Sequence, residues 1–252
     1  MWPGDPGGSR GRTDDQSDGP DLLPGRSRGS DRSHDGGCVL RGDRCRGRSG
    51  SGHGDPAVLR ALAVDRLPRP GARVRPGDVV AVVGAGPVGV LAAACARLAG
   101  AAEVVLADSD AGRREGFTGA GRIVAPEQLA DTVAELTRGW GAHSVIEAVG
   151  SPTALSTAVG AAAPRATVAA VGVHHAEAAF PAGTAFAREL TVRFVVGDPI
   201  DVREPVLALL RHKRLDPAEL ISHRLPLSAA ADAYDLFDRR EAFKIVLAPS
   251  EL

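Results

Sequence analysis

The sequence is poor in cysteine, in net charge and in long apolar runs. Its 252 residues include only three cysteines, Cys38, Cys45 and Cys95. They are too few and too irregularly spaced to predict a disulfide framework or a CxxC zinc site. Cys95 lies in an alanine-rich stretch with a helical pattern, so we expect it to be a core residue.

The lack of strong charge and of a membrane segment excludes two classes of partner. The formal net charge is −1, which does not predict general nucleic-acid binding. No apolar run reaches the roughly 18 residues of a membrane span. The start, Met1–Asp5, lacks the apolar core of a signal peptide. We therefore expect a cytoplasmic protein with neither nucleic-acid nor membrane partners.

Residues 1–70 contain no lysine, glutamate, isoleucine, phenylalanine, tyrosine or asparagine. Their glycine, arginine, aspartate, serine and proline bury too little apolar surface to offset the entropy of ordering, which predicts disorder. A solvated tail fits better than an RNA-binding arm, because the aspartates offset the arginines. Lys213 and Lys244 are the only lysines, and this arginine bias indicates GC-rich coding DNA. A second hypothesis is therefore that part of residues 1–70 is a mis-framed start.

The strongest signal in the chain is the stretch Gly84–Gly89, with the sequence GAGPVG. It follows the apolar run Asp78–Val83 and precedes the alanine-rich run Leu91–Leu98. A GxGxxG pattern alone is weak evidence, but strand, glycine turn and helix are the context in which it binds a dinucleotide.

Each residue of this turn has a physical role in the prediction. Gly84 permits the tight turn, Gly86 leaves room for the pyrophosphate, and Gly89 lets the helix pack closely on the strand. Pro87 has a φ that is preset for the first helical turn. The free N–H groups of that turn, with Val88 in it, and the positive helix end would then face the phosphates.

A second apolar run, Glu103–Ala107, ends in an acidic residue, Asp108. Asp108 follows Gly84 by 24 residues, close to the spacing of about 20 for a carboxylate on the adenosine ribose. A carboxylate there accepts hydrogen bonds from the 2′-hydroxyl and repels a 2′-phosphate, so Asp108 favours NAD over NADP. A solvated turn residue is the simpler alternative.

Strands and helices alternate after residue 70. The strands are expected at 78–83, 103–107, 121–124, 144–149, 166–171 and 190–196, and the helices at 88–99, 111–118, 127–138, 153–163 and 204–214. Continuously apolar strands between helices predict an α/β fold whose parallel sheet is covered on both faces. Six strands in two halves predict a doubly wound Rossmann domain over 74–214.

The predicted sheet places the cofactor contacts at the carboxyl ends of its strands. These are the glycine turn Gly84–Gly89, Asp108, the pair Val149 and Gly150, and the segment of Val171, Gly172 and Val173. The following stretch, 215–252, has an extended segment, a helix near 228–237 and a strand at 243–247. It does not extend the parallel sheet in an obvious way and reads as part of a second unit.

Val74–Pro249 resembles the C-terminal two-thirds of the medium-chain, zinc-type alcohol dehydrogenases. The matching stretches are Val74–Asp78, Gly84–Gly89, Val145–Pro152, Val171–His174, Ile221–Leu227 and Lys244–Leu247. The resemblance implies NAD-dependent exchange of hydride with an alcohol, polyol or carbonyl substrate. It also implies a homo-oligomer, with the sixth strand at the interface, and makes 215–252 part of a catalytic domain.

The resemblance assigns roles to individual cofactor residues. Asp108 would hold the adenosine ribose with help from Arg113, and the segment from Val171 to Val173 would touch the nicotinamide. Lys244 would reach the pyrophosphate. Arg113 and Lys244 are also consistent with ordinary solvated charges.

In the family, the ligands of the zinc ion lie in a catalytic domain that precedes the nucleotide-binding unit. The sequence departs from this pattern. Zinc lowers the pKa of the alcohol there and needs a Cys- and His-based ligand set. Nothing in residues 1–70 reproduces that ligand set, although Cys38, Cys45 and His53 have the residue types of zinc ligands. We therefore name no metal ligands and no catalytic residue, and we predict that loss of the catalytic domain impairs catalysis.

Three other functions stay open beside the dehydrogenase. A zinc-free quinone or enoyl reductase of the same superfamily would usually prefer NADPH, and a nucleotide-binding module would have no catalysis. A methyltransferase of this fold would usually lack the third glycine, present here as Gly89. His174 and His175 follow the fifth strand, as cofactor or substrate contacts or as solvated loop residues. Glu147 has a structural role as its simplest interpretation.

Overall fold

The computed structural model describes residues 71–116, 121–175, 179–196 and 203–249. These residues all belong to one unit of the chain, Gly50–Leu252. The predictions for residues 1–70 lie outside the described residues. No helix in the described part of the chain is long and apolar enough to cross a membrane.

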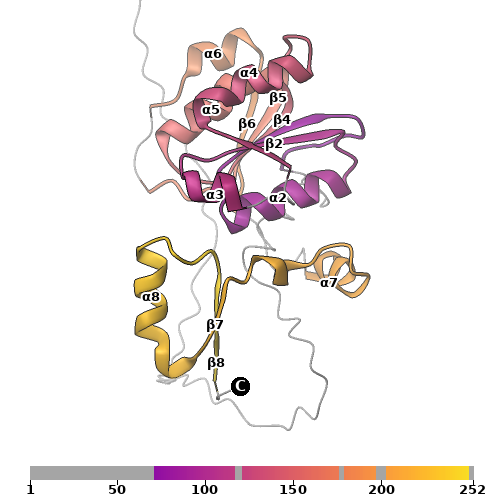
Figure 1. Cartoon of the computed structure of the whole chain (residues 1–252). Helices are drawn as coiled ribbons and strands as arrows, with labels where there is room; N and C mark the ends of the chain where they lie inside the picture. Colours follow the sequence, from indigo (N-terminus) through magenta and orange to yellow (C-terminus); the bar gives the residue numbers. More distant parts are fainter. Residues whose placement is uncertain (1–70, 117–120, 176–178, 197–202, 250–252) are drawn as a thin grey trace, which may run out of the picture. The chain divides into compact units, whose positions relative to one another are not determined.

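The described residues contain a six-stranded sheet in which all neighbouring strands are parallel (Figure 1). Its order is β3-β2-β1-β4-β5-β6. The strands are β1 (Val79–Val83), β2 (Glu103–Ala107), β3 (Arg122–Val124), β4 (Ala142–Glu147), β5 (Ala162–Ala170) and β6 (Thr191–Phe194). The order reverses between β1 and β4, which makes the carboxyl ends of these two strands the switch point at which ligands bind in such sheets.

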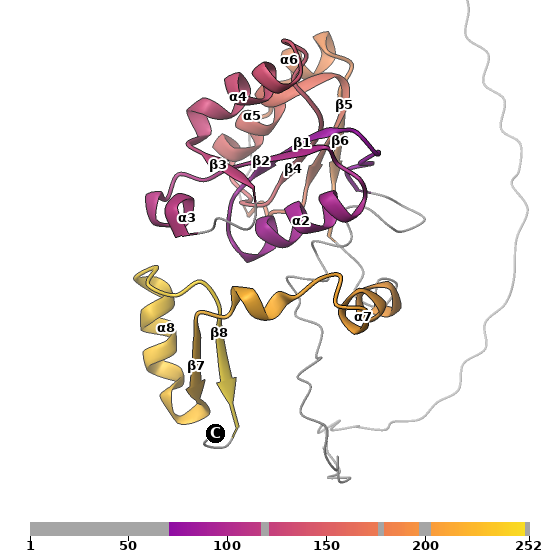
Figure 2. The same ribbon diagram turned by 45° about the vertical axis from the view of Figure 1, so that its right-hand side comes forward.

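Helices cover both faces of this sheet, as continuously apolar strands require. The helices of this region are α2 (Pro87–Leu98), α3 (Ala111–Gly116), α4 (Leu129–Leu136), α5 (Pro152–Ala161) and α6 (Ala182–Ala187), with the 3-10 turn η1 (Pro126–Gln128). Figure 2 shows α2 on one face and α4 and α5 on the other. All five residues of β1 are buried. Val80 and Val82 belong to the hydrophobic cluster that contains the buried residues of α2. The other three residues of β1 belong to the cluster that contains buried residues of α4 and α5. The predicted doubly wound fold is confirmed.

Most element ends differ from the predicted ones by a few residues, and two of the differences have a clear cause. Helix α5 ends at Ala161 and β5 begins at Ala162, whereas the prediction carried this helix to Ala163. Pro164 explains this, because a proline disfavours the α conformation of the residue before it. The short helix α6 was not predicted, since Gly183 and the preceding Pro181 are typical of a loop.

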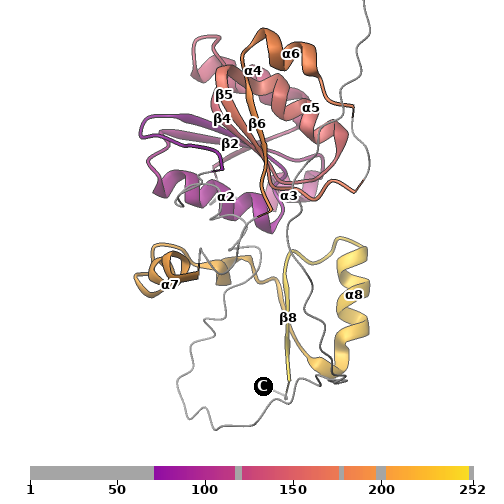
Figure 3. The same ribbon diagram turned by 180° about the vertical axis from the view of Figure 1, so that it is seen from behind.

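The chain after β6 forms α7 (Arg203–Arg211) and a second, two-stranded parallel sheet. The sheet pairs β7 (His223–Pro226) with β8 (Ile245–Ala248). The 3-10 turn η3 (Leu227–Ala229) and helix α8 (Ala230–Asp238) connect them, and η2 (Pro217–Leu220) precedes β7. Figure 3 shows α8 alongside this pair. As predicted, this segment does not extend the main sheet, while a domain boundary at residue 214 stays a prediction.

Candidate functional site

The glycine turn joins β1 to α2 at the switch point of the sheet. Gly84 has a φ of +101°, a region that L side chains rarely adopt. A Cβ on Gly84 would lie 2.7 Å from Cγ2 of Val149. Its N–H donates to the carbonyl of Ala107 at 2.7 Å. Gly84 therefore makes a turn that a side chain would strain and crowd.

The start of α2 has the form of an anion-binding helix end. Its N-cap is Gly86, no side chain caps it, and Pro87 is its first residue. A Cβ on Gly86 would find no atom of the described residues closer than an Arg113 nitrogen, 3.7 Å away. Because the first N–H groups of a helix lack partners within it, Val88 and its neighbours leave donors at an uncrowded helix end.

Gly89 seats α2 directly on the glycine turn. A Cβ on Gly89 would overlap the carbonyl oxygen of Gly84 and lie 2.9 Å from its carbonyl carbon. No rotation of a side chain could relieve a contact with backbone. The close packing predicted for this third glycine is confirmed.

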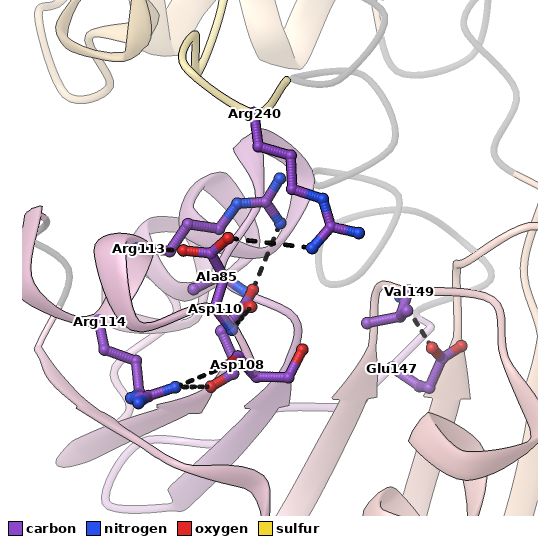
Figure 4. A network of polar contacts seen from close by, with 9 residues as sticks. Ala85, Asp108, Asp110, Arg113, Arg114, Glu147, Val149 and Arg240 are labelled. Carbon is purple, nitrogen blue, oxygen red and sulfur yellow. Dashed lines mark hydrogen bonds and ion pairs between the residues drawn. The ribbon is translucent and has the colours of Figure 1, made fainter. Parts of the chain in front are cut away.

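Asp108 connects the end of β2 to the glycine turn (Figure 4). Its side chain is 7% exposed. Oδ2 accepts a hydrogen bond from the N–H of Ala85 at 2.7 Å and a long one from Arg113 at 3.5 Å, while Oδ1 accepts from the N–H of Asp110 at 2.9 Å. A carboxylate offers about four acceptor positions, so the three hydrogen bonds from described residues leave one position on Oδ1. Asp108 thus holds the turn and still has room for a hydroxyl donor.

Two arginines flank this carboxylate in different ways. The guanidinium of Arg113 lies 3.5 Å from Asp108 and is 36% exposed. Arg114 donates instead to the backbone carbonyls of Asp108 and Ser109, both at 2.9 Å. Arg114 therefore fixes the backbone beyond β2, and Arg113 is the arginine whose side chain borders the turn near Gly86.

The segments that follow β4 and β5 approach each other very closely at Gly150 and Gly172, a place that we call the Gly150–Gly172 crossing. Gly150 has a φ of +88°, and a Cβ there would lie 2.7 Å from the nitrogen of Val173. A Cβ on Gly172 would lie 2.7 Å from Cα of Gly150. The N–H groups of Val171 and Gly172 both donate to the carbonyl of Glu147, at 2.8 and 3.1 Å. The two segments predicted to meet the cofactor are therefore held together by their own backbones.

Glu147 is a fully buried carboxylate at this crossing. Its Oε1 accepts a hydrogen bond from the N–H of Val149 at 2.8 Å (Figure 4) and another from the N–H of Gly150 at 2.7 Å. Its Oε2 lies 3.1 Å from Nε2 of His174, whose side chain is 12% exposed. The sequence suggested a structural role for Glu147 and left His174 as a cofactor contact, a substrate contact or a solvated loop residue, but it did not predict their pairing.

Two valines expose apolar surface at the same strand ends. Val149 is 53% exposed and Val173 is 45% exposed. Val149 precedes Gly150 and Val173 follows Gly172, so both lie at the Gly150–Gly172 crossing. Exposed apolar side chains beside a buried polar pair are typical of a ligand site.

Lys244 lies just before β8. Its backbone carbonyl accepts hydrogen bonds from the N–H and the hydroxyl of Ser222, at 2.9 and 3.1 Å. This places its backbone at the start of the β7–β8 pair. Its predicted contact with the pyrophosphate stays a prediction.

The described residues include no group of three or more Cys, His, Asp or Glu side chains arranged to hold a metal ion. The described residues therefore do not fit a zinc ion, and we derive no step through one. Cys38, Cys45 and His53 lie outside the described residues. His143 has a structural role, since its Nδ1 accepts a hydrogen bond from the N–H of Val79 at 3.0 Å.

Residues 87–212 match a family model described as zinc-binding dehydrogenase. A probable zinc-binding alcohol dehydrogenase of Mycobacterium tuberculosis is 37% identical over 159 residues, which cover 63% of this chain and 41% of the relative. The L-galactonate-5-dehydrogenase of Escherichia coli is 31% identical over 201 residues, which cover 77% of this chain and 57% of the relative. The chain spans about half the length of the curated relatives it matches.

Solved structures give the same result. An alcohol dehydrogenase from Thermus sp. ATN1 superposes with a TM-score of 0.69 at 35% identity. The superposition covers 76% of this chain and 56% of that one.

Proposed function

Because the chain belongs to the zinc-binding dehydrogenase family, we propose that the described residues bind NAD across the switch point of the sheet. One observation carries this proposal: the hydrogen bond from the Ala85 N–H to the Asp108 carboxylate. It joins the glycine turn and the acidic strand end in one network, and these are the two elements that such a fold uses for the pyrophosphate and the adenosine ribose.

The roles of the adenosine half follow from this network. The pyrophosphate lies over Gly86 at the uncapped start of α2, where Pro87, Val88 and Gly89 form the first turn. The ribose hydroxyl donates to the free acceptor position of Asp108. Arg113, beside this carboxylate, and Lys244 supply positive charge toward the cofactor.

The nicotinamide half lies at the ends of β4 and β5. In a doubly wound sheet the second half takes the second nucleotide. Val149, Gly150, Val171, Gly172 and Val173 form its contact surface, and the two exposed valines offer apolar contacts to the ring. When bound, NAD supplies the carbon that accepts or returns a hydride.

We propose an alcohol, polyol or corresponding carbonyl compound as the substrate of hydride transfer. The family supports this choice, and the relatives that match include proteins named for alcohols, for L-galactonate and for D-xylulose. The impaired catalysis that the sequence predicts stays a prediction. Zinc content together with NADH formation from simple alcohols tests it, and stoichiometric zinc with turnover would contradict it.

Fluorescence titration of the full chain with NADH and NADPH tests the cofactor proposal. We expect NADH to bind more tightly, because the Asp108 carboxylate repels a 2′-phosphate. A preference for NADPH would contradict the role of Asp108 and favour a zinc-free quinone or enoyl reductase. Binding of S-adenosylmethionine without NADH would overturn the dehydrogenase proposal. Binding of NADH with no turnover on any alcohol would favour a non-catalytic nucleotide-binding module.

We also propose that the chain forms a homo-oligomer through the edge of the sheet at β6. Phe186 is 87% exposed and Phe194 is 65% exposed, an unusual amount of aromatic surface for a solvated edge. Phe186 also lines a hollow of about 660 Å³, together with Phe180, Leu190 and Val192 among others. Among the described residues β6 is the last strand of the sheet, and an edge strand is where a second copy can join a sheet.

A further inference from the structure

Glu147 and His174 form a buried polar pair that the proposed function leaves without a task. The two residues are 27 positions apart in the chain, and the sheet register brings them together at the ends of β4 and β5. Glu147 is completely buried, and its Oε2 lies 3.1 Å from Nε2 of His174.

The contacts of Glu147 decide which nitrogen of His174 carries hydrogen. Oε1 already accepts two backbone N–H groups, from Val149 and Gly150. In its carboxylate form Glu147 only accepts hydrogen bonds, so the contact at Oε2 requires an N–H on Nε2. In the neutral imidazole Nδ1 is then left with a bare lone pair, an acceptor.

Nδ1 of His174 is buried and has no hydrogen-bond partner among the described residues. Buried polar atoms in folded proteins nearly always have a partner, and an exception calls for a missing ligand or water. Other contacts hold the imidazole ring of His174 in place: the one with Glu147 and an edge-to-face contact with Phe194, whose ring centroid lies 5.6 Å from that of His174. For the neutral imidazole, the missing partner of Nδ1 is a hydrogen-bond donor.

We propose that His174 is a positioning residue for the nicotinamide ring, and that its Nδ1 accepts a hydrogen bond from the carboxamide amino group. The inference rests on the proposed function. His174 directly follows Val173, one of the two exposed valines of the proposed contact surface. The amino group is the only donor on the nicotinamide ring. A hydrogen bond to it restricts rotation of the ring and so fixes which face meets the substrate.

The dinucleotide that carries 3-acetylpyridine in place of nicotinamide tests this contact, because a methyl group replaces the amino group. Calorimetric titration of the full chain should show NAD binding about 10-fold more tightly than this analogue, the effect of one hydrogen bond to a buried acceptor. ADP-ribose, which lacks the ring, reports the adenosine half alone.

The variant His174→Gln keeps an amide that can reach Glu147 but has no atom in place of Nδ1. It should lose the preference for NAD over the analogue and leave ADP-ribose affinity unchanged. Glu147→Gln should do the same, because a Gln amide that donates to Nε2 moves the ring hydrogen to Nδ1. His175→Gln, at the exposed neighbouring histidine, is the matched control and should keep the preference.

The outcomes separate the two proposals. If the unmodified chain binds neither ADP-ribose nor NAD, the proposed function is wrong. If it binds both and binds the analogue as tightly as NAD, only the role of His174 is wrong. The comparison on the unmodified chain decides this even where a variant fails to fold. Persistent discrimination in His174→Gln would also overturn the role of His174 and assign the amino group to another acceptor.

Discussion

Asp108 combines a structural and a proposed binding role in one side chain. Its carboxylate holds the glycine turn through Ala85 and the following loop through Asp110, while one acceptor position remains. A residue that builds the site it serves cannot be removed without changing both. The informative variant is therefore the isosteric amide, which keeps an acceptor oxygen and removes the charge.

We predict that Asp108→Asn lowers the ratio of the NADPH to the NADH dissociation constant about 10-fold, which corresponds to roughly 1.4 kcal/mol. The loss of negative charge removes the repulsion of a 2′-phosphate. Paired NADH and NADPH titrations measure the ratio. Asp131→Asn, at an exposed position in the first turn of α4, is the control. An unchanged ratio in Asp108→Asn would show that the carboxylate does not face the ribose.

At the scale of elements, the position of α2 depends on a missing side chain. Gly89 packs against the backbone of Gly84, which leaves no space for even one carbon. Gly160 lies in α5 with nothing within 4 Å of the place where its Cβ would be. The two helices therefore offer a matched pair of glycines in opposite surroundings.

We predict that Gly89→Ala lowers the free energy of unfolding by about 3 kcal/mol, because overpacking against backbone cannot relax. Gly160→Ala should raise it by roughly 0.5 to 1 kcal/mol, since alanine has the higher helix propensity. Denaturant unfolding of both variants measures the difference. Equal effects of the two substitutions would contradict the close packing of α2.

The sequence predicts elements better than it predicts contacts between them. The buried strands were predictable because β1 is apolar throughout and β2 is apolar after Glu103. The helix α6 was not, because Pro181 and Gly183 are residues of loops. The pair of Glu147 and His174 could not be found by any local pattern, since only the register of β4 and β5 brings it together.

The candidate site also has residues that the sequence predicts and contacts that it does not predict. The glycine turn and Asp108 were predictable because their spacing along the chain is itself the signal. The hydrogen bond between Ala85 and Asp108 and the crossing of Gly150 with Gly172 depend on three-dimensional placement. The sequence predicted no metal ligands, and the described residues contain no group of side chains arranged to hold a metal ion.

At the scale of the whole molecule, ligand binding and stability are linked. A ligand that binds only the folded chain stabilises it in proportion to the logarithm of its concentration. We predict that NAD at 100 times its dissociation constant raises the free energy of unfolding by about 2.7 kcal/mol. Thermal unfolding with and without NAD measures this, and S-adenosylmethionine should have no effect.

The exposed edge at β6 gives a prediction of assembly. If the edge joins two copies, Phe186→Ser should reduce the mass in light scattering to that of one chain, because the substitution removes an aromatic side chain from the hollow. Tyr234→Ser removes another highly exposed aromatic side chain, from α8, and serves as the control. A single-chain mass for the unmodified protein would contradict the interface.

The contact between Gly89 and Gly84 has a further consequence for how this chain can change. The same absent carbon seats a helix in the core and aims the donors of that helix at the proposed phosphate position. A substitution that adds a side chain at Gly89 therefore changes both the stability of the fold and the affinity for the cofactor. We expect random mutagenesis to yield variants altered in both properties at this turn and variants altered in only one elsewhere on α2.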